Sequence, residues 1–439
     1  MKLLKSRRVR FLTLALLIAP PALWALVLTL VPMTWARTRV TEALAKAVGQ
    51  PVKLADLKLS LLGGVRLKGL EISAPQAETT PWLKVESLSI DVNLAQLVSG
   101  HLEPRLVEAR GVDLRVHRFA DGRFEFGDLL QGDPNPPTVA PKADPVHPEA
   151  GPLTFRLSEA TVRLIDDSSG TKLDFDDVQG HGTKQGGRVE LAELKGKLNG
   201  GPFELGATYD RVGGAPAFEG QFRAEDVALG VGMDALGYLV PILSSRGTES
   251  LDGTLDLNLY LRGQGAGGAE IRRSLVGQGS IALDPIRLDS SRILSELSAV
   301  LPLPAERRVG SVRSQFAIKD SRVSTRDLTI QVAQVPIMLT GWTSFDGQLD
   351  YQVKSEGLTA RAEGLTARLP AEARGFLDDL PIKLNDLMNL RITGTFDRVA
   401  LSVDGVPLTG RRQGGSIVRP EDRAKLRQSG RRLLDRILR

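Results

Sequence analysis

The feature that most constrains the fold is a strict alternation of apolar and polar residues, which recurs along most of the chain. Residues 253–263 read GTLDLNLYLRG, with Leu255, Leu257, Leu259 and Leu261 at every second position. Successive side chains of a β-strand point to opposite faces of its sheet, so this period of two predicts a strand with one apolar face. What covers these apolar faces is therefore the central question for both fold and function.

The composition favours many short strands over a helical protein with one thick core. The chain has 45 glycines and 25 prolines, and only 5% of its residues are aromatic. Such a composition is typical of strands joined by turns. We therefore predict a mainly β fold: an N-terminal transmembrane helix, then an elongated, twisted antiparallel β-sheet that forms an apolar groove, with a few short helices and a C-terminal basic helix.

The N-terminal region predicts a membrane anchor. Residues 11–36 contain no charged residue, and this stretch exceeds the roughly 20 residues that a helix needs to cross a bilayer. A cleaved signal peptide is the alternative, but its apolar region is usually about 7 to 15 residues long. Residues 1–10 carry five basic and no acidic residues, so the positive-inside rule predicts a cytoplasmic N-terminus and an exported remainder.

The C-terminal region, residues 411–439, predicts a basic amphipathic helix. Apolar residues recur at helical spacing between arginines, which suits an anionic membrane surface or a protein partner; a solvated tail is the alternative. The candidate residues for a membrane surface are Arg431, Arg432, Leu434, Arg436 and Ile437.

A proline-rich segment supplies the strongest candidate boundary in the exported part. Residues 131–152 contain seven prolines, which a sheet interior does not accommodate, so we predict an exposed linker or loop. The predicted regions are a basic tail (1–10), an anchor (11–36), a first β region (37–130), the linker (131–152), a second β region (153–410, with its C-terminal part at about 268–405) and the basic tail (411–439).

Little in the sequence points to catalysis, a metal, a cofactor or nucleic acid. The four histidines are scattered, there is no cysteine, and the pairs Asp166-Asp167 and Asp176-Asp177 flank turns or strand ends, where aspartate is favoured for local hydrogen bonds. The net charge of +5 lies at the two ends, so the 400 residues between them carry −7, which argues against a phosphate-binding surface over the bulk of the chain. We expect no enzyme activity, no cofactor and no nucleic-acid partner.

The apolar strand faces predict a groove for acyl chains. The sequence predicts too few helices to cover these faces, whereas an apolar groove with polar rims accounts for the apolar face of every predicted strand. A β-sandwich or barrel whose leucines pack against one another remains the alternative. The candidate lining residues are Leu88, Ile90, Val92, Leu94, Leu255, Leu257, Leu259, Leu261, Leu328, Ile330, Val332, Leu349, Tyr351 and Val353. In residues 82–94, WLKVESLSIDVNL, the apolar parity changes, which predicts a bulge near Glu86 and Ser87.

The region after the anchor resembles the start of AsmA-like proteins. The resemblance rests on VTEALAKAVGQPVKLADLKLSLLGGVRLKGLEIS at residues 40–73 and on PWLKVESLSIDVNLAQLVSGHLEPRLVEARGVDLRVHRFADGRFEFGDLL at residues 81–130. Residues 274–301, with FAIKDSRVSTRDLTIQV and GQLDYQVK further on, resemble the C-terminal region of the same family. The family is related to bridge-like lipid transfer proteins and supplies no catalytic residues to this chain.

The resemblance implies a protein of the bacterial inner membrane, single-pass, with its bulk in the periplasm and a role in outer-membrane biogenesis. The predicted partners are the inner membrane and phospholipid acyl chains, together with a possible outer-membrane or periplasmic protein. The predicted function is to bind or pass phospholipid along the apolar groove. The alternative is an assembly factor or scaffold for outer-membrane proteins or an envelope complex, working without lipid.

Overall fold

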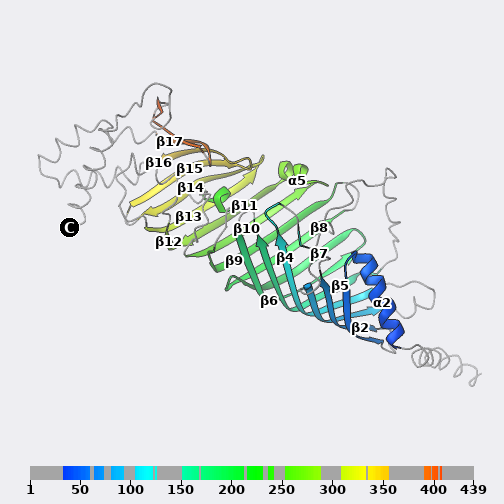
Figure 1. The fold of residues 1–439 in the computed structure, drawn as a ribbon. Coiled ribbons are helices and arrows are strands. Elements are labelled where there is room, and N and C mark those ends of the chain that lie inside the picture. The colour runs from blue at the N-terminus through cyan, green and yellow to red at the C-terminus, as the bar shows by residue number, and fades with distance from the viewer. Residues whose placement is uncertain are drawn as a thin grey trace, which may run out of the picture. The chain divides into compact units, whose positions relative to one another are not determined.

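The structure is a computed structural model of the whole chain, and strands dominate it (Figure 1). It describes residues 33–59, 64–73, 81–92, 104–121, 124–125, 151–167, 170–211, 215–230, 236–241, 253–287, 308–332, 335–354, 390–396, 398–403 and 406–407. The prediction of a mainly β chain with few helices is confirmed for these residues. The predicted basic helix at 411–439, the predicted linker up to residue 150 and the predicted lining residue Leu94 lie outside them.

The chain divides into two compact units, of which the first comprises residues 1–165 and 174–196. Its elements are α2 (Met33–Val48), β1 (Val52–Leu59), β2 (Gly64–Ser73), β3 (Pro81–Val92), β4 (Pro104–Arg118), β5 (Leu153–Asp166), β6 (Thr171–Gln185) and β7 (Arg188–Leu198). Strands β1 to β4 pair antiparallel in sequence order. Three ion pairs join β4 to β5. Strand β6 lies between β5 and β7: a Cβ added at Gly182 of β6 would contact Phe155 of β5 and Glu190 of β7.

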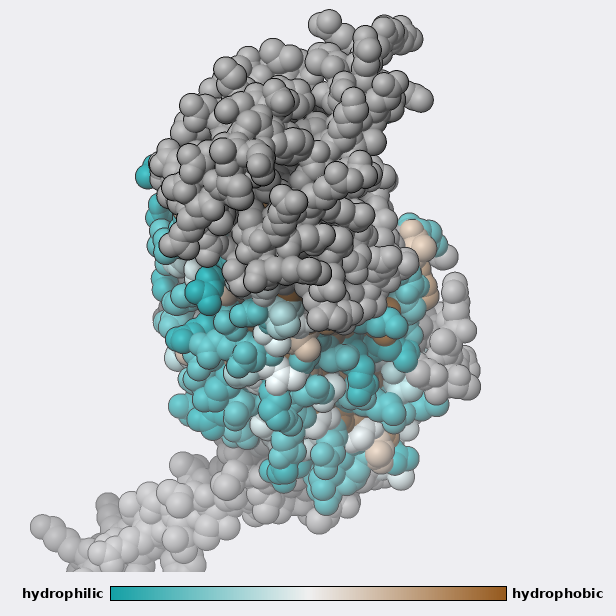
Figure 2. Space-filling view, turned by 90° about the vertical axis from the view of Figure 1, so that its left-hand side faces the viewer, coloured by the Kyte–Doolittle hydropathy of each residue, from teal (hydrophilic) through white to brown (hydrophobic). Residues whose placement is uncertain are grey.

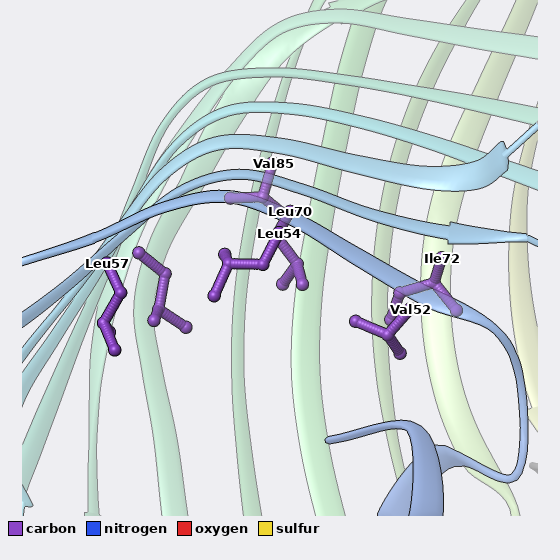
Figure 3. Close-up of a cluster of buried hydrophobic side chains, with 7 residues drawn as sticks. Val52, Leu54, Leu57, Leu70, Ile72 and Val85 are labelled. Atoms are coloured by element: carbon purple, nitrogen blue, oxygen red, sulfur yellow. The ribbon is translucent and has the colours of Figure 1, made fainter. Parts of the chain in front are cut away.

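Helix α2 packs on the apolar face of the first unit. Val40, Leu44 and Val48 contact the cluster of buried side chains on β1 to β3, and Figure 3 shows this cluster on the side of the strands that faces the helix. The helix ends at Val48 and is followed by Gly49, whose φ of +69° favours glycine and whose N–H donates a hydrogen bond to the carbonyl of Ala45 at 2.8 Å. None of the helices in the described part of the chain is long and apolar enough to cross a membrane, and residues 11–32 of the predicted anchor lie outside that part.

In β1 to β4 the alternation of buried and exposed side chains shifts by one residue, at the same row across all four strands. Leu54 and Leu57 are both buried although they lie three positions apart, and the neighbouring strands show the same step. The register passes over one residue in each strand: Ala55, Gly69, Glu86 and Gly111. Gly111 has φ +64°, and a Cβ there would meet Glu86 Oε2 at 2.6 Å. A bulge would shift the register by one residue, but the pairing of β3 with β2 and with β4 keeps the same register on both sides of Glu86, so the bulge predicted near Glu86 and Ser87 is wrong. One residue of every strand is passed over instead, and this keeps both halves of each strand apolar on one face.

The second unit comprises residues 166–173 and 197–439. Its elements are β8 (Gly201–Asp210), β9 (Ala217–Ala228), α4 (Leu236–Leu239), β10 (Thr254–Gln264), α5 (Gly268–Ser274), β11 (Val276–Asp284), β12 (Ile286–Arg287), β13 (Arg308–Lys319), β14 (Arg322–Val332), β15 (Val335–Ser344), β16 (Gln348–Lys354), β17 (Leu390–Thr395), β18 (Arg398–Val403) and β19 (Val406–Pro407).

In the second unit, β8, β9, β10 and β11 pair antiparallel in sequence order, and β11 then pairs with β13. From β13 to β19 the strands again pair in sequence order, and the two-residue strand β12 pairs with β13. Helix α4 contacts β15. Helix α5 begins at the last glycine of GQGAGG, residues 263–268. Its Glu270 in the first turn and Arg272 and Arg273 in the last turn complement the helix dipole.

Candidate functional site

The leucines of β10 lie on an apolar face whose exposure changes along the strand. Leu255 is 5% exposed, whereas Leu257, Leu259 and Leu261 are partly exposed. The register pairs Leu255 with Val227 of β9 and with Leu283 of β11, which are both fully buried. The same alternation in the sequence therefore produces a closed end and an accessible end on one strand.

Two neighbouring strands extend the accessible end. Phe222 of β9 pairs with Leu259 on one side and with Leu205 of β8 on the other, so the three side chains form one row across the sheet. Six partly exposed apolar side chains define what we name the open apolar patch: Leu205, Phe218, Phe222, Leu257, Leu259 and Leu261. Next to Phe218 in the register lies Tyr209, which is 41% exposed and places a phenol at the border of the patch.

Three glycines lie opposite the leucines of this patch on the neighbouring strands: Gly220, Gly277 and Gly279. Leu261 lies between Gly220 of β9 and Gly277 of β11 in the register. A Cβ added at Gly277 would meet Leu261 Cδ2 at 2.6 Å, and one added at Gly279 would meet the ring of Phe316 at 2.7 Å, so neighbouring side chains already cover these glycines. At Gly220 the nearest side-chain atom is Ala207 Cβ, at 3.5 Å. A Cβ at Gly220 would therefore meet no neighbour closer than 3.3 Å, so the position is less crowded than Gly277 and Gly279.

The apolar face of β13 to β17 is closed to solvent. We name as the closed apolar region the buried residues Leu328, Ile330, Ile337, Leu339, Leu349, Tyr351, Val353, Leu390 and Ile392, none of which is more than 3% exposed. Buried hydroxyl groups on β13 to β16 are paired with one another. The hydroxyls of Ser314 and Thr325 lie 2.7 Å apart, and those of Thr343 and Tyr351 lie 2.9 Å apart. Such pairing is typical of a packed core, because buried polar groups without partners are costly.

Burial sets the protonation of Tyr351. Desolvation raises the pKa of its phenol to about 12, and the hydrogen bond with Thr343 opposes this shift. The phenol therefore stays neutral over the physiological range and acts as a hydrogen-bonding core residue.

The structure places the predicted lining residues in three different settings. Leu257, Leu259 and Leu261 belong to the open apolar patch, and Leu88 and Ile90 of β3 are partly exposed on the apolar face of the first unit. Leu255 and the predicted residues Leu328, Ile330, Leu349, Tyr351 and Val353 are buried. Val92 and Val332 lie at strand ends, at positions whose side chains the structure does not describe. Sequence analysis missed Leu205, Phe218 and Phe222, although AFEGQF at residues 217–222 shows the same alternation.

Hydrophilic residues cover most of the described surface on the side shown in Figure 2, and hydrophobic residues are visible only in small areas between them. The described residues include no group of three or more His, Asp or Glu side chains that could hold a metal ion.

A second feature, which we name the polar cleft, lies within the first unit. It has a volume of about 810 Å³ and is lined by side chains from β2 to β7, including Arg66, Lys68, Glu86, Arg156 and Lys195. Leu67, between Arg66 and Lys68, is 4% exposed and belongs to the apolar cluster. Because neighbouring side chains of a strand point apart, the polar cleft lies on the face of the strands opposite to that cluster.

Comparison with known proteins supports the resemblance seen in the sequence. Over 142 residues, 32% of this chain, the sequence is 28% identical to Protein AsmA of Escherichia coli (strain K12). The predicted similarity to AsmA-like proteins is thereby confirmed for that part of the chain. The matched residues span 21% of Protein AsmA, about a fifth of that relative's length. The chain matches no protein-family profile and no solved structure.

Proposed function

We propose that this protein is anchored in a bacterial inner membrane and binds phospholipid acyl chains on the open apolar patch, as part of outer-membrane biogenesis. The observation that carries the proposal is the contrast within one unit between the closed apolar region, at 0 to 3% exposure, and the partly exposed row Leu205–Phe222–Leu259. Apolar side chains that stay accessible in an otherwise closed sheet typically mark an interaction site.

The mechanism that we propose is passive. An acyl chain lies against Leu257, Leu259 and Leu261 and over Gly220, while its headgroup stays in water at the rim. Each CH₂ group removed from water contributes about 0.8 kcal/mol, so a segment of five or six CH₂ groups gains about 4 kcal/mol before the cost of ordering it. No catalysis and no cofactor enter this proposal. The similarity to Protein AsmA supports an envelope role, and the apolar, uncharged residues 11–36 support the anchor.

The test is a pair of substitutions at neighbouring positions on β10. Leu259→Asp places a carboxylate in the open apolar patch, whereas Asn258→Asp places the same group on the opposite, exposed face of the same strand. We expect the full-length Leu259→Asp variant, purified in detergent, to retain markedly less phospholipid than the wild type, as measured by mass spectrometry of the extracted lipids. Asn258→Asp serves as the matched control and should retain the wild-type amount.

Equal lipid retention by both folded variants would contradict the proposal. A folded wild-type chain that copurifies with a client protein and without lipid would favour the assembly-factor alternative instead.

A further inference from the structure

The polar cleft of the first unit contains three matched cation–carboxylate pairs. Arg156 lies 3.1 Å from Glu108, Arg110 lies 2.8 Å from Glu159, and Lys195 lies 3.1 Å from Glu193. Glu159 raises the pKa of the Arg110 guanidinium, and Glu86 adds to the effect. The first two pairs join β4 to β5, and the third lies within β7. In each pair the positive charge is balanced by the carboxylate beside it.

Two further cations on β2 are not matched in this way. Among the residues that the structure describes, no carboxylate lies within ion-pair distance of Arg66 or Lys68. Arg66 Nε donates a hydrogen bond to the hydroxyl of Ser89 at 3.1 Å, and the register places Ser87 opposite Lys68. Arg66, Lys68, Ser87 and Ser89 all line the cleft. Two exposed cations and two hydroxyls thus lie side by side on two paired strands.

A third cation adds to the positive charge at this place. The register sets Lys58 of β1 directly opposite Arg66, and the Lys58 side chain is 61% exposed. Like charges directly opposite on neighbouring strands destabilise the pair. Asp56 lies directly opposite Lys68 in the register and reaches Lys58 at 3.8 Å, so on these two strands one carboxylate stands against the three cations Lys58, Arg66 and Lys68. A bound anion would offset the rest.

We propose that Arg66 and Lys68, together with the hydroxyls of Ser87 and Ser89, bind a phosphate group in the polar cleft. A phosphomonoester carries a charge of about −1.5 to −2 near neutral pH and three acceptor oxygens. The guanidinium of Arg66 matches two of these oxygens at once, Lys68 supplies a point charge, and the two hydroxyls are neutral donors. Positions i and i+2 of a strand are about 6.6 Å apart, which two long side chains can span to meet on one anion.

This site is distinct from the proposed lipid site, because the polar cleft is lined by strands of the first unit and the open apolar patch belongs to β8 to β10 of the second unit. The phosphate could come from a soluble anion or from the headgroup of a lipid. Both sources present a negatively charged terminal phosphate group to Arg66 and Lys68, so the experiment includes one probe of each kind.

The experiment measures binding to the full-length protein in detergent micelles by isothermal titration calorimetry. The two probes are inorganic phosphate and dihexanoyl phosphatidate, which carries a terminal phosphate group on a lipid backbone. The test variant is Arg66→Ala/Lys68→Ala. The matched control is Lys184→Ala/Arg188→Ala, which removes the same charge from exposed positions at the β6–β7 turn, outside the cleft lining.

We expect the test variant to bind at least about tenfold more weakly than the wild type, since it loses the charge-assisted hydrogen bonds of two cations, which are stronger than neutral ones. The control should bind as the wild type does. Saturable binding of inorganic phosphate would assign the site to phosphate itself. Binding of phosphatidate alone, weakened in the test variant, would assign it to a lipid headgroup. Absence of saturable binding of both probes, or equal weakening in both double variants, would overturn the proposal.

Discussion

The contrast between the closed apolar region and the open apolar patch predicts different costs for the same substitution. Leu328 of β14 is 0% exposed, and its register partner Leu339 on β15 is 1% exposed. Leu259 of β10 is partly exposed and pairs with Gly279 on one side. Truncating either side chain to alanine removes the same atoms, so the difference in cost reports only the surroundings.

The expected magnitudes follow from burial. Leu328→Ala loses the full transfer free energy and leaves a cavity, and such changes cost about 3 to 5 kcal/mol in a packed core. Leu259→Ala loses only part of the transfer term, and water can enter the space, so no cavity remains. Its expected cost is about 1 to 2 kcal/mol. The difference in the free energy of unfolding should therefore be about 2 kcal/mol.

The assay is unfolding of the full-length variants by urea in detergent, monitored by circular dichroism. Both the midpoint and the slope of the unfolding free energy against urea concentration are compared between the variants. Equal midpoints with equal urea dependence would refute the reasoning, because they would show that Leu259 is packed as tightly as Leu328. A larger loss for Leu259→Ala than for Leu328→Ala would refute it as well.

Further predictions concern the glycines and the buried tyrosine. Gly220→Ala should change the midpoint of thermal unfolding very little, because the added Cβ would lie 3.5 Å from Ala207 Cβ and 3.3 Å from a carbonyl oxygen. Gly279→Ala should lower that midpoint clearly, because the added Cβ would lie 2.3 Å from a carbonyl oxygen and 2.7 Å from the ring of Phe316. The pKa of Tyr351, raised to about 12, makes the folded state hold its proton after the unfolded state has lost it near pH 10, so stability should fall between about pH 10 and 12 by up to about 2.7 kcal/mol. Tyr351→Phe should reduce this alkaline loss in pH-dependent unfolding; an unchanged slope would contradict the assignment.

Much of the fold could be predicted from the sequence, because strand periodicity is a local property. The alternation in residues 253–263 predicts β10, and the parity change in residues 82–94 locates the row at Glu86, although the bulge predicted there is absent from the register. The end of α2 before Gly49 follows from glycine's tolerance of positive φ. Each of these features depends on residues close together in the chain.

The exposure of each apolar face could not be predicted in the same way. Leu255 and Leu259 occupy equivalent positions in one ladder, yet only Leu255 has fully buried neighbours on both adjoining strands. Leu328 follows the same alternation and is closed to solvent. Exposure depends on which residues of other strands lie opposite, and therefore on a register that one sequence does not reveal. The polar cleft was missed for the same reason, although Arg66 and Lys68 alternate with buried Leu67.

The most direct test of the central claim is a residue-resolved photocrosslink in cell membranes. The photoreactive residue p-benzoylphenylalanine would replace Leu259 in one variant of the full-length chain and Asn258 in another, and mass spectrometry would identify what each captures. We predict a phospholipid adduct at position 259 and none at position 258. Absence of lipid at position 259, or the same lipid yield at both positions, would contradict the account.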